Sequence, residues 1–368
     1  MKTIKLLLVC LLFTQSWLWA GGSQESTPAD IEERIDLSLT ITDSLGRTLI
    51  LPKMPERIVQ AGAFAFIIND ALFLFPEAKE RVVAMADSNQ GRGFFLPIAD
   101  TAYDKKIIMP RSVNIEEILA AAPDLVILKD FHYSKYDKEF QKVGIPVIYL
   151  NLESPEAWEN DLDILGAIFD NTDRVKELKD LFSAYAENVS APLMDLKQED
   201  RKKSLVLYYS EKDGSGAFQV PPLTFIQAKM LTMAGSDPVW GDADIGTRWT
   251  KVGFEQIAAW NPDQIFLISY RTSIATIMDT ISNSAYWQEL RAFKEGEIHP
   301  FPMDFHSWDQ PDPRWLLGLQ WLAGQAHPEL FPDLDMNKRA ETFFADFYGI
   351  SSEDYRNKIL PASEGILP

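Results

Sequence analysis

One short phrase occurs twice in the chain, and this repeat restricts the fold more than any other feature. Residues 112–128 read SVNIEEILAAAPDLVIL, and residues 251–267 read KVGFEQIAAWNPDQIFL. A constant offset of 139 residues aligns the two Pro-Asp pairs and places Glu116 opposite Glu255. Each copy combines apolar residues at helical spacing with a Pro-Asp pair and a continuous apolar run. This pattern predicts a short helix leading into a strand that is buried on both faces.

The spacing of the repeat indicates two similar α/β lobes. A helix followed by a buried strand is half of a βαβ unit, and solenoid repeats would return every few tens of residues. The 368 residues are enough for two lobes, each with its own core. We therefore expect a first lobe over residues 37–154 and a second lobe, with C-terminal helices, over residues 204–368.

The segment between the two lobes, residues 155–203, is expected to form a long linking helix. After Pro155 it contains one further proline, Pro192, and one glycine, and Val175, Leu178 and Leu181 belong to an apolar stripe at helical spacing. A break is expected at residues 170–172, where an N-cap residue restarts the helix. Two independent helices within one domain are the alternative, and the repeated phrase on either side favours the linking helix.

The first 20 residues are typical of a signal peptide, and residues 21–36 are typical of a flexible tether. Lys2 and Lys5 precede an apolar stretch that ends in small residues. Cys10 is the one cysteine, and it lies inside the apolar stretch, which argues against lipid anchoring. Cleavage after Ala20 would give a periplasmic protein without thiols, and therefore without disulfides, thiolate metal sites or iron–sulfur clusters.

Charge and motifs argue against two broad classes of function. A formal net charge of −19 disfavours nucleic acid as a partner, because binding it needs clustered Lys and Arg. The chain has no Gly-x-Ser-x-Gly elbow and no glycine-rich phosphate loop. Ser307 stands beside His306 and Asp309, but sequence neighbours rarely form a nucleophilic triad. We expect a protein that is not an enzyme, with a chelatase-like architecture as the alternative.

Several other segments carry a resemblance to a known family. They are Thr42–Arg47, Pro55–Val59, Gly144–Ile148, Trp287–Pro302 and Trp308–Phe331. With the repeated phrase, and in this order, they resemble the solute-binding proteins of ABC importers for ferric siderophores, haem and cobalamin. The resemblance implies two Rossmann-like lobes joined by a long α-helical spine, a monomer that clamps its ligand between the lobes, and an ABC permease dimer in the inner membrane as partner.

The resemblance also implies a role for the two glutamates of the repeated phrase. In the family, one exposed glutamate on each lobe docks onto arginines of the two permease subunits, and Glu116 and Glu255 stand at matching places. Glu117 is a competing choice in the first lobe. The simpler interpretation is a carboxylate in the first helical turn, favoured there by the helix dipole.

Ligand contacts are expected from the loops that follow the strands. Aromatic and arginine side chains recur in these loops, which suits a chelate with an apolar body and anionic groups. The candidates are Phe64, Asn89, Arg92, Arg111, His132, Tyr133, Tyr209, Phe218, Arg248, Trp249, Tyr270, Arg271, His306 and Trp308.

Each type of candidate also has a simpler interpretation. Arg92 and Arg248 would equally serve as paired surface charges, and Trp249 and Trp308 as core residues, although their polar neighbours favour loops. His132 and His306 are the two histidines among the candidates, and direct metal ligation by either is a minor alternative to solvated or capping roles.

The composition favours a metal complex over a free metal ion as cargo. Four histidines and no cysteine after the signal do not make a dedicated metal site of clustered ligands. We expect no cofactor, and a ferric siderophore or another iron chelate as ligand. Cobalamin, haem and an oxyanion such as molybdate or tungstate remain alternatives, the oxyanion because Arg111, Arg248 and Arg271 would hold it.

Overall fold

The computed structural model describes residues 38–90, 92–212 and 215–365. The predicted signal peptide, the tether and Cys10 lie outside these residues. Within them, no helix combines the length and the apolar character that crossing a membrane requires.

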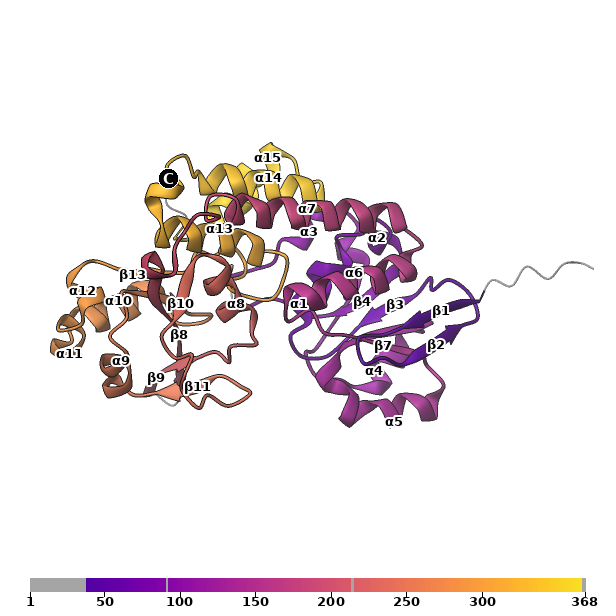
Figure 1. Cartoon of the computed structure of the whole chain (residues 1–368). Helices are drawn as coiled ribbons and strands as arrows, with labels where there is room; N and C mark the ends of the chain where they lie inside the picture. Colours follow the sequence, from indigo (N-terminus) through magenta and orange to yellow (C-terminus); the bar gives the residue numbers. More distant parts are fainter. Residues whose placement is uncertain (1–37, 91, 213–214, 366–368) are drawn as a thin grey trace, which may run out of the picture. The chain divides into compact units, whose positions relative to one another are not determined.

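The first lobe is built on a five-stranded parallel sheet, preceded by a hairpin. The hairpin pairs β1 (Leu39–Thr42) with β2 (Thr48–Leu51), as the alternating pattern predicts. The sheet has the order β5-β4-β3-β6-β7, and Figure 1 labels its strands β3, β4 and β7. Its strands are β3 (Ile58–Gln60), β4 (Val82–Ala86), β5 (Ile107–Met109), β6 (Leu125–Lys129) and β7 (Val147–Leu150).

Strands β3, β6 and β7 are buried along their whole length, because helices cover both faces of this sheet. Residues such as Val59 and Val126 pack on one face, and residues such as Ile58 and Ile127 pack on the other. The helices are α1 (Ala65–Leu72), α2 (Ala78–Arg81), α3 (Leu96–Ala99), α4 (Ile115–Ala120) and α5 (Tyr133–Val143).

The second lobe contains a six-stranded mixed sheet with the path β11-β9-β8-β12-β13, in which β10 also pairs with β8. Strands β10, β12 and β13 run parallel to their neighbours, whereas β9 and β11 are antiparallel. The strands are β8 (Lys202–Lys212), β9 (Ser215–Val220), β10 (Ser236–Pro238), β11 (Thr250–Val252), β12 (Gln264–Ile268) and β13 (Ile298–Pro300).

The glycines and prolines between Ser210 and Pro222 predict a loop, and this prediction is wrong. Most of this stretch belongs to two antiparallel strands, because β8 and β9 pair from Tyr208 opposite Gln219 to Lys212 opposite Ser215. The lobe's helices are α8 (Ile226–Met233), α9 (Phe254–Trp260), α10 (Ile274–Ser282), α11 (Ala285–Gln288), α12 (Arg291–Lys294), α13 (Trp315–Ala326), α14 (Met336–Tyr348) and α15 (Ser352–Asp354).

Two helices connect the sheets, α6 (Pro155–Phe169) and α7 (Thr172–Ser190). The break at residues 170–172 is confirmed: Asp170 ends α6 in the left-handed region, and the Asn171 side chain caps α7 by accepting from the N–H of Arg174. A Cβ on Gly166 would lie 2.1 Å from Val175, so the glycine lets α7 pack closely on α6.

The prediction that the linking helix extends to Lys203 is wrong at its end. Helix α7 stops at Ser190, because Pro192 has no N–H for the next helical hydrogen bond. Turns and a short 3-10 helix at Gln198–Asp200 then lead into β8.

The repeated phrase forms the predicted helix and strand in both lobes, as α4 with β6 and as α9 with β12. The Asp124 carboxylate accepts hydrogen bonds from the backbone N–H groups of Glu56 and Arg57 at 2.9 and 2.8 Å. Asp263 accepts from the N–H of Lys203 at 2.8 Å. In each lobe, this aspartate therefore ties its own strand to the start of the neighbouring strand, β3 or β8.

The two copies differ in backbone strain after the helix. Ala122 and Asn261 occupy equivalent positions, and both have a positive φ, of 49° and 43°. Asparagine tolerates this left-handed conformation, but alanine does not. We expect Ala122→Gly to stabilise the protein by about 0.5–1 kcal/mol, the left-handed strain less the extra chain entropy of glycine. The midpoint of urea unfolding at unchanged slope measures this gain.

Ala120→Gly provides the matched control, because Ala120 is also exposed but ends α4 in a helical conformation. This change should destabilise by about 0.5–1 kcal/mol. Equal losses in the two variants would show that Ala122 carries no strain.

Candidate functional site

The carboxyl ends of the two sheets come together at the loops that follow their strands. The amide of Gln90, after β4, lies 3.2 Å from the amide of Gln310, after β13. Arg92 forms an ion pair with Glu364 at 2.8 Å. In parallel α/β sheets, this edge is where ligands bind.

In the first lobe, an aromatic pair stands in solvent at this edge. Phe64, with 58% of its surface exposed, packs edge-to-face against Phe131, with 50% exposed, and their ring centroids are 5.8 Å apart. Phe64 precedes α1 with a φ of 58°, which is strained for a bulky residue. Two exposed phenylalanines side by side are unusual for a surface without a partner.

His132 packs beneath the loop that carries Phe64. It is buried, and its Nε2 accepts a hydrogen bond from the N–H of Ala63 at 3.1 Å. Burial lowers the pKa of His132. Gly62 is required here, because a Cβ would lie 2.5 Å from the ring. His132 therefore shapes the loop that presents Phe64.

The other first-lobe candidates have different surroundings. Arg111 is exposed and pairs with Asp87 at 3.7 Å, and Asn89 is exposed beside it. Tyr133 packs on Tyr149, with a centroid distance of 5.4 Å, and under the guanidinium of Arg47 in the β1–β2 turn. The structure thus does not bring Tyr133 together with Phe64.

The second lobe carries a cluster of three aromatic residues at the ends of β8 and β12. The ring centroid of Tyr208 lies 4.8 Å from that of Tyr270 and 5.3 Å from that of Trp249. The Tyr270 hydroxyl donates to Asp309 at 2.7 Å, and burial raises the pKa of this phenol well above its usual value. The hydrogen bond from Tyr270 to the buried Asp309 thus fixes the orientation of one ring of the cluster.

The aromatic cluster contains Tyr208, whereas its neighbour Tyr209 is the residue predicted as a ligand contact. Tyr209 pairs with Phe218 across the hairpin, and Phe218 in turn packs on Trp287 at 5.0 Å. Successive side chains of a strand point to opposite faces, so Tyr209 and Phe218 lie on the face away from Trp249. Tyr208 follows the buried residues Leu205 and Leu207 in the same strand. This alternation does not show that Tyr208 packs against Trp249 and Tyr270.

Two arginines accompany the aromatic cluster. Burial raises the pKa of Tyr208, and the nearby charge of Arg271 partly opposes this. Arg248 directly precedes Trp249. Both arginines are exposed, and no described carboxylate lies within 4.0 Å of either guanidinium. In a chain with an excess of acidic residues, this makes them available for an anion.

The expectation that His306 and Trp308 lie in an open loop is wrong. Both are fully buried, together with the whole segment 301–323. Trp308 donates from Nε1 to Asp304 at 3.0 Å, and the Nε2 of His306 lies 3.0 Å from the Ser88 carbonyl oxygen. Neither side chain is accessible to a ligand at the strand ends.

A buried ionic cluster accounts for this burial. Arg314 donates to Asp304 at 2.8 and 3.0 Å and to Asp70 of α1 at 2.6 Å, and it lies 3.3 Å from Asp312. Its guanidinium lies 4.6 Å from the ring centroid of Phe95. Burial raises the pKa of Asp312 to about 7, against the lowering effect of Arg314. The cluster joins α1 to the segment before α13.

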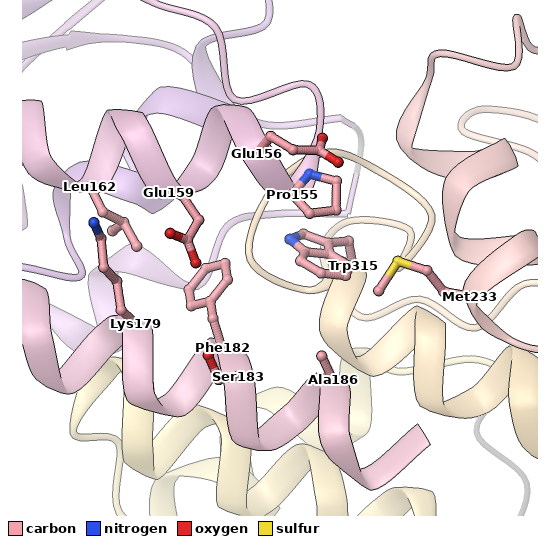
Figure 2. A pocket seen from close by; sticks show the side chains of 10 residues that line it. All are labelled: Pro155, Glu156, Glu159, Leu162, Lys179, Phe182, Ser183, Ala186, Met233 and Trp315. Atoms are coloured by element: carbon pink, nitrogen blue, oxygen red, sulfur yellow. The ribbon is translucent and has the colours of Figure 1, made fainter. Parts of the chain in front are cut away.

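A separate pocket lies where α6, α7, α8 and α13 meet (Figure 2). Its apolar wall includes Leu162, Phe182, Met233 and Trp315, and none of the predicted ligand contacts lines it.

Glu116 and Glu255 both stand in the first turn of their helices and are exposed. The Asn114 side chain caps α4 by accepting from the N–H groups of Glu116 and Glu117. Helix α9 begins after Gly253, without a side-chain cap. Glu117 is exposed as well, so burial does not choose between the two carboxylates of α4.

Comparison with known proteins identifies the family. The model of the family described as periplasmic binding protein matches residues 81–302. The chain belongs to the periplasmic binding protein family. Its members are substrate-binding proteins that pair with ABC transporters and are not enzymes, and membership implies a location outside the cytoplasm.

Relatives of this binding protein carry different cargo. Molybdate-binding protein MolA of Haemophilus influenzae is 25% identical over 95% of this chain and 98% of the relative. Petrobactin-binding protein YclQ of Bacillus subtilis is 26% identical over 84% and 93%. A periplasmic solute-binding protein from Veillonella parvula, 21% identical, matches the fold with a TM-score of 0.67 over 86% of this chain and 96% of that one.

Proposed function

We propose that this binding protein captures an anionic iron chelate between the strand ends of its two lobes and delivers it to an ABC permease. The observation that carries the proposal is the exposed pair of Phe64 and Phe131, beside strand ends that meet those of the second lobe. An organic chelate offers apolar surface for these rings to cover, whereas a small hydrated anion does not.

The second lobe supplies the complementary chemistry. Arg248 and Arg271 would donate charge-assisted hydrogen bonds to the anionic groups of the chelate, and Tyr208, Trp249 and Tyr270 would pack on its body. Asn89 and Arg111 would contribute from the first lobe. Relatives that bind petrobactin and Fe(3+)-citrate are consistent with this class of cargo.

Molybdate is the second candidate, because the molybdate-binding relative aligns with 95% of this chain. Arg248 and Arg271 would hold an oxyanion without help from the phenylalanines. The two candidates therefore differ in what they require of Phe64 and Phe131.

Two double variants separate these candidates. Phe64→Ala with Phe131→Ala should weaken binding of a citrate-type ferric chelate by about tenfold, since two rings lose contact area. Arg248→Ala with Arg271→Ala should weaken it by about 100-fold or more, because each charged hydrogen bond contributes roughly 1.5–3 kcal/mol. Titration calorimetry with ferric petrobactin, ferric citrate and molybdate measures both effects.

The control for aromatic loss is Tyr286→Ala, which removes an aromatic residue that is 73% exposed on α11. It should change no affinity. Binding of molybdate but of neither iron chelate, with affinity insensitive to the phenylalanine change, would replace the chelate by the oxyanion.

The delivery step rests on the two helix-start glutamates. Glu116 and Glu255 would each contact one subunit of the permease dimer, since the repeat places them at matching positions of two similar lobes. Neither glutamate is among the proposed cargo contacts, so docking and capture can be tested independently.

A further inference from the structure

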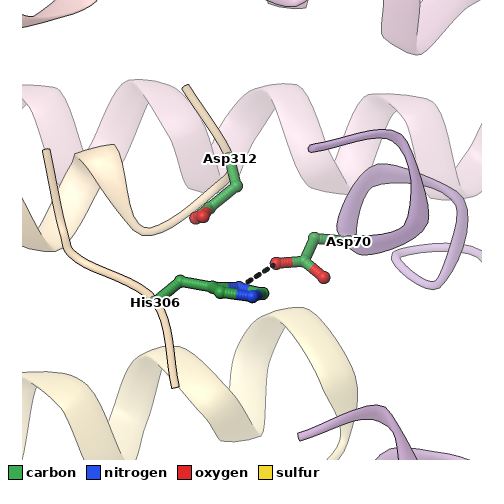
Figure 3. A group of neighbouring side chains, drawn as sticks. All are labelled: Asp70, His306 and Asp312. Carbon is green, nitrogen blue, oxygen red and sulfur yellow. Dashed lines mark ion pairs between the residues drawn. The ribbon is translucent and has the colours of Figure 1, made fainter. Parts of the chain in front are cut away.

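Three side chains with metal-ligand chemistry converge inside the ionic cluster (Figure 3). They are Asp70 of α1, and His306 and Asp312 of the segment between β13 and α13. One ligand atom from each lies within 4.8 Å of the others, and all three side chains are buried. Asp70 and His306 stand 236 positions apart in the sequence, so the group exists only in the folded chain.

Each of these side chains has one possible metal-ligand atom that lacks a hydrogen-bond partner among the described residues. The atoms are Oδ1 of Asp70, Oδ2 of Asp312 and Nδ1 of His306. Nη2 of Arg314, a hydrogen-bond donor, is also unsatisfied there. Buried polar atoms are nearly always satisfied, so three unsatisfied acceptor atoms in one place require an explanation. Figure 3 shows the His306 ring and the Asp70 carboxylate facing each other, with Asp312 on the neighbouring segment.

The imidazole of His306 is oriented as in metal sites. Its Nε2 lies 3.0 Å from the Ser88 carbonyl, which can only accept, so Nε2 carries the hydrogen. Metal-binding histidines typically donate their second ring N–H in this way. Nδ1 faces an Asp70 oxygen at 3.6 Å, which is too long for a hydrogen bond. In a neutral ring, two lone pairs would face each other there.

The charge of the cluster also calls for a cation. The carboxylates of Asp70, Asp304 and Asp312 are opposed by the single guanidinium of Arg314, and all four side chains are at most 1% exposed. With all three carboxylates ionised, two negative charges would remain without a counter-ion in the described contacts. Burying unpaired charge is costly, and a divalent cation would balance this excess.

We propose that Asp70, His306 and Asp312 bind a divalent transition-metal ion that fastens the first lobe to the second. One imidazole and two carboxylates suit Zn²⁺ or Mn²⁺. For ligand bonds of 2.0–2.2 Å, tetrahedral ligands stand about 3.4 Å apart. Nδ1 of His306 lies 3.6 Å from Oδ2 of Asp70, the oxygen that also accepts from Arg314, and Oδ1 of the same carboxylate is without a hydrogen-bond partner among the described residues. This ion is distinct from the cargo, because the cluster is closed to solvent and the strand-end loops are not.

Refolding with and without metal tests the site. Protein unfolded in guanidinium with a chelator would be refolded with Zn²⁺, with Mn²⁺ or with neither, then dialysed and measured by mass-spectrometric metal analysis. Wild type should retain one equivalent of one of the two metals and unfold at a higher temperature when it is present. His306→Gln and Asp312→Asn should reduce the retained metal by about tenfold or more.

His299→Gln is the matched control, because His299 also faces a carboxylate, Glu297 at 2.9 Å, but outside the cluster. It should retain metal like wild type. Circular dichroism of each refolded variant separates loss of the site from loss of the fold.

Two outcomes would overturn the proposal. One is wild type that retains no more Zn²⁺ or Mn²⁺ than His306→Gln. The other is a metal-free wild type that Asp312→Asn stabilises, because the cluster would then be held together by a proton on Asp312 rather than by a metal ion.

Discussion

Replacing Glu116 and Glu255 together by alanine is expected to abolish uptake and to leave cargo affinity unchanged. Both carboxylates are exposed in first helical turns, and neither belongs to the loops proposed to hold the cargo. Removing them takes away two charged contacts with the permease but little internal stability, roughly 0.3–1 kcal/mol each through the helix dipole. Uptake by proteoliposomes with the cognate permease, beside calorimetric cargo titration, measures the two properties separately.

The repeat itself supplies the control for this experiment. Glu117 and Gln256 are the next residues on the same two turns, at the same offset of 139. Glu117→Ala with Gln256→Ala should support normal uptake. If that pair abolishes uptake and the Glu116/Glu255 pair does not, the docking contact belongs to the neighbouring positions.

Arg314→Met is expected to destabilise the protein by about 3–5 kcal/mol, as for other broken buried ion pairs. Among the described residues, Arg314 is the one arginine whose guanidinium contacts Asp70, Asp304 and Asp312. Its loss leaves these three buried carboxylates without their cationic partner. Methionine keeps much of the volume between Phe95 and Phe344, so the effect reports charge rather than a cavity. Denaturant unfolding at neutral pH measures the change in free energy.

Arg356→Met is the comparison for Arg314→Met. Arg356 pairs with Glu341 at 2.9 Å, but its side chain is 63% exposed. A surface pair of this kind contributes about 0–1 kcal/mol. Losses of similar size in the two variants would mean that the carboxylates at Arg314 are neutralised in another way.

The sequence predicts those helices and strands that are determined by residues close together in the chain. The hairpin β1–β2, the helix and strand of each repeated phrase and the restart of the linking helix at Asn171 all follow from periodicity and capping. Glycine-rich stretches are less clear, because glycine marks a loop and a tight hairpin turn equally well. This explains why the pairing of β8 with β9 was missed.

The interior of the candidate site depends on contacts between distant residues. The stretch around His306 is rich in Asp and Ser and therefore has the composition of an exposed loop. Arg314 reaches Asp70 across 244 positions and compensates these polar groups in the interior. Likewise, the choice between Tyr208 and Tyr209 depends on which face of β8 meets Trp249. No local pattern contains that information.

Helix α1 connects the exposed Phe64 to Asp70, which pairs with Arg314 of the second lobe. Phe64 precedes the helix, and Asp70 lies six residues later, a rise of about 9 Å. All eight helical residues are buried, so α1 has no freedom to slide or bend alone. If cargo binds at Phe64 as proposed, a displacement of Phe64 would shift α1 and with it Asp70, so cargo binding would change the contacts between the two lobes.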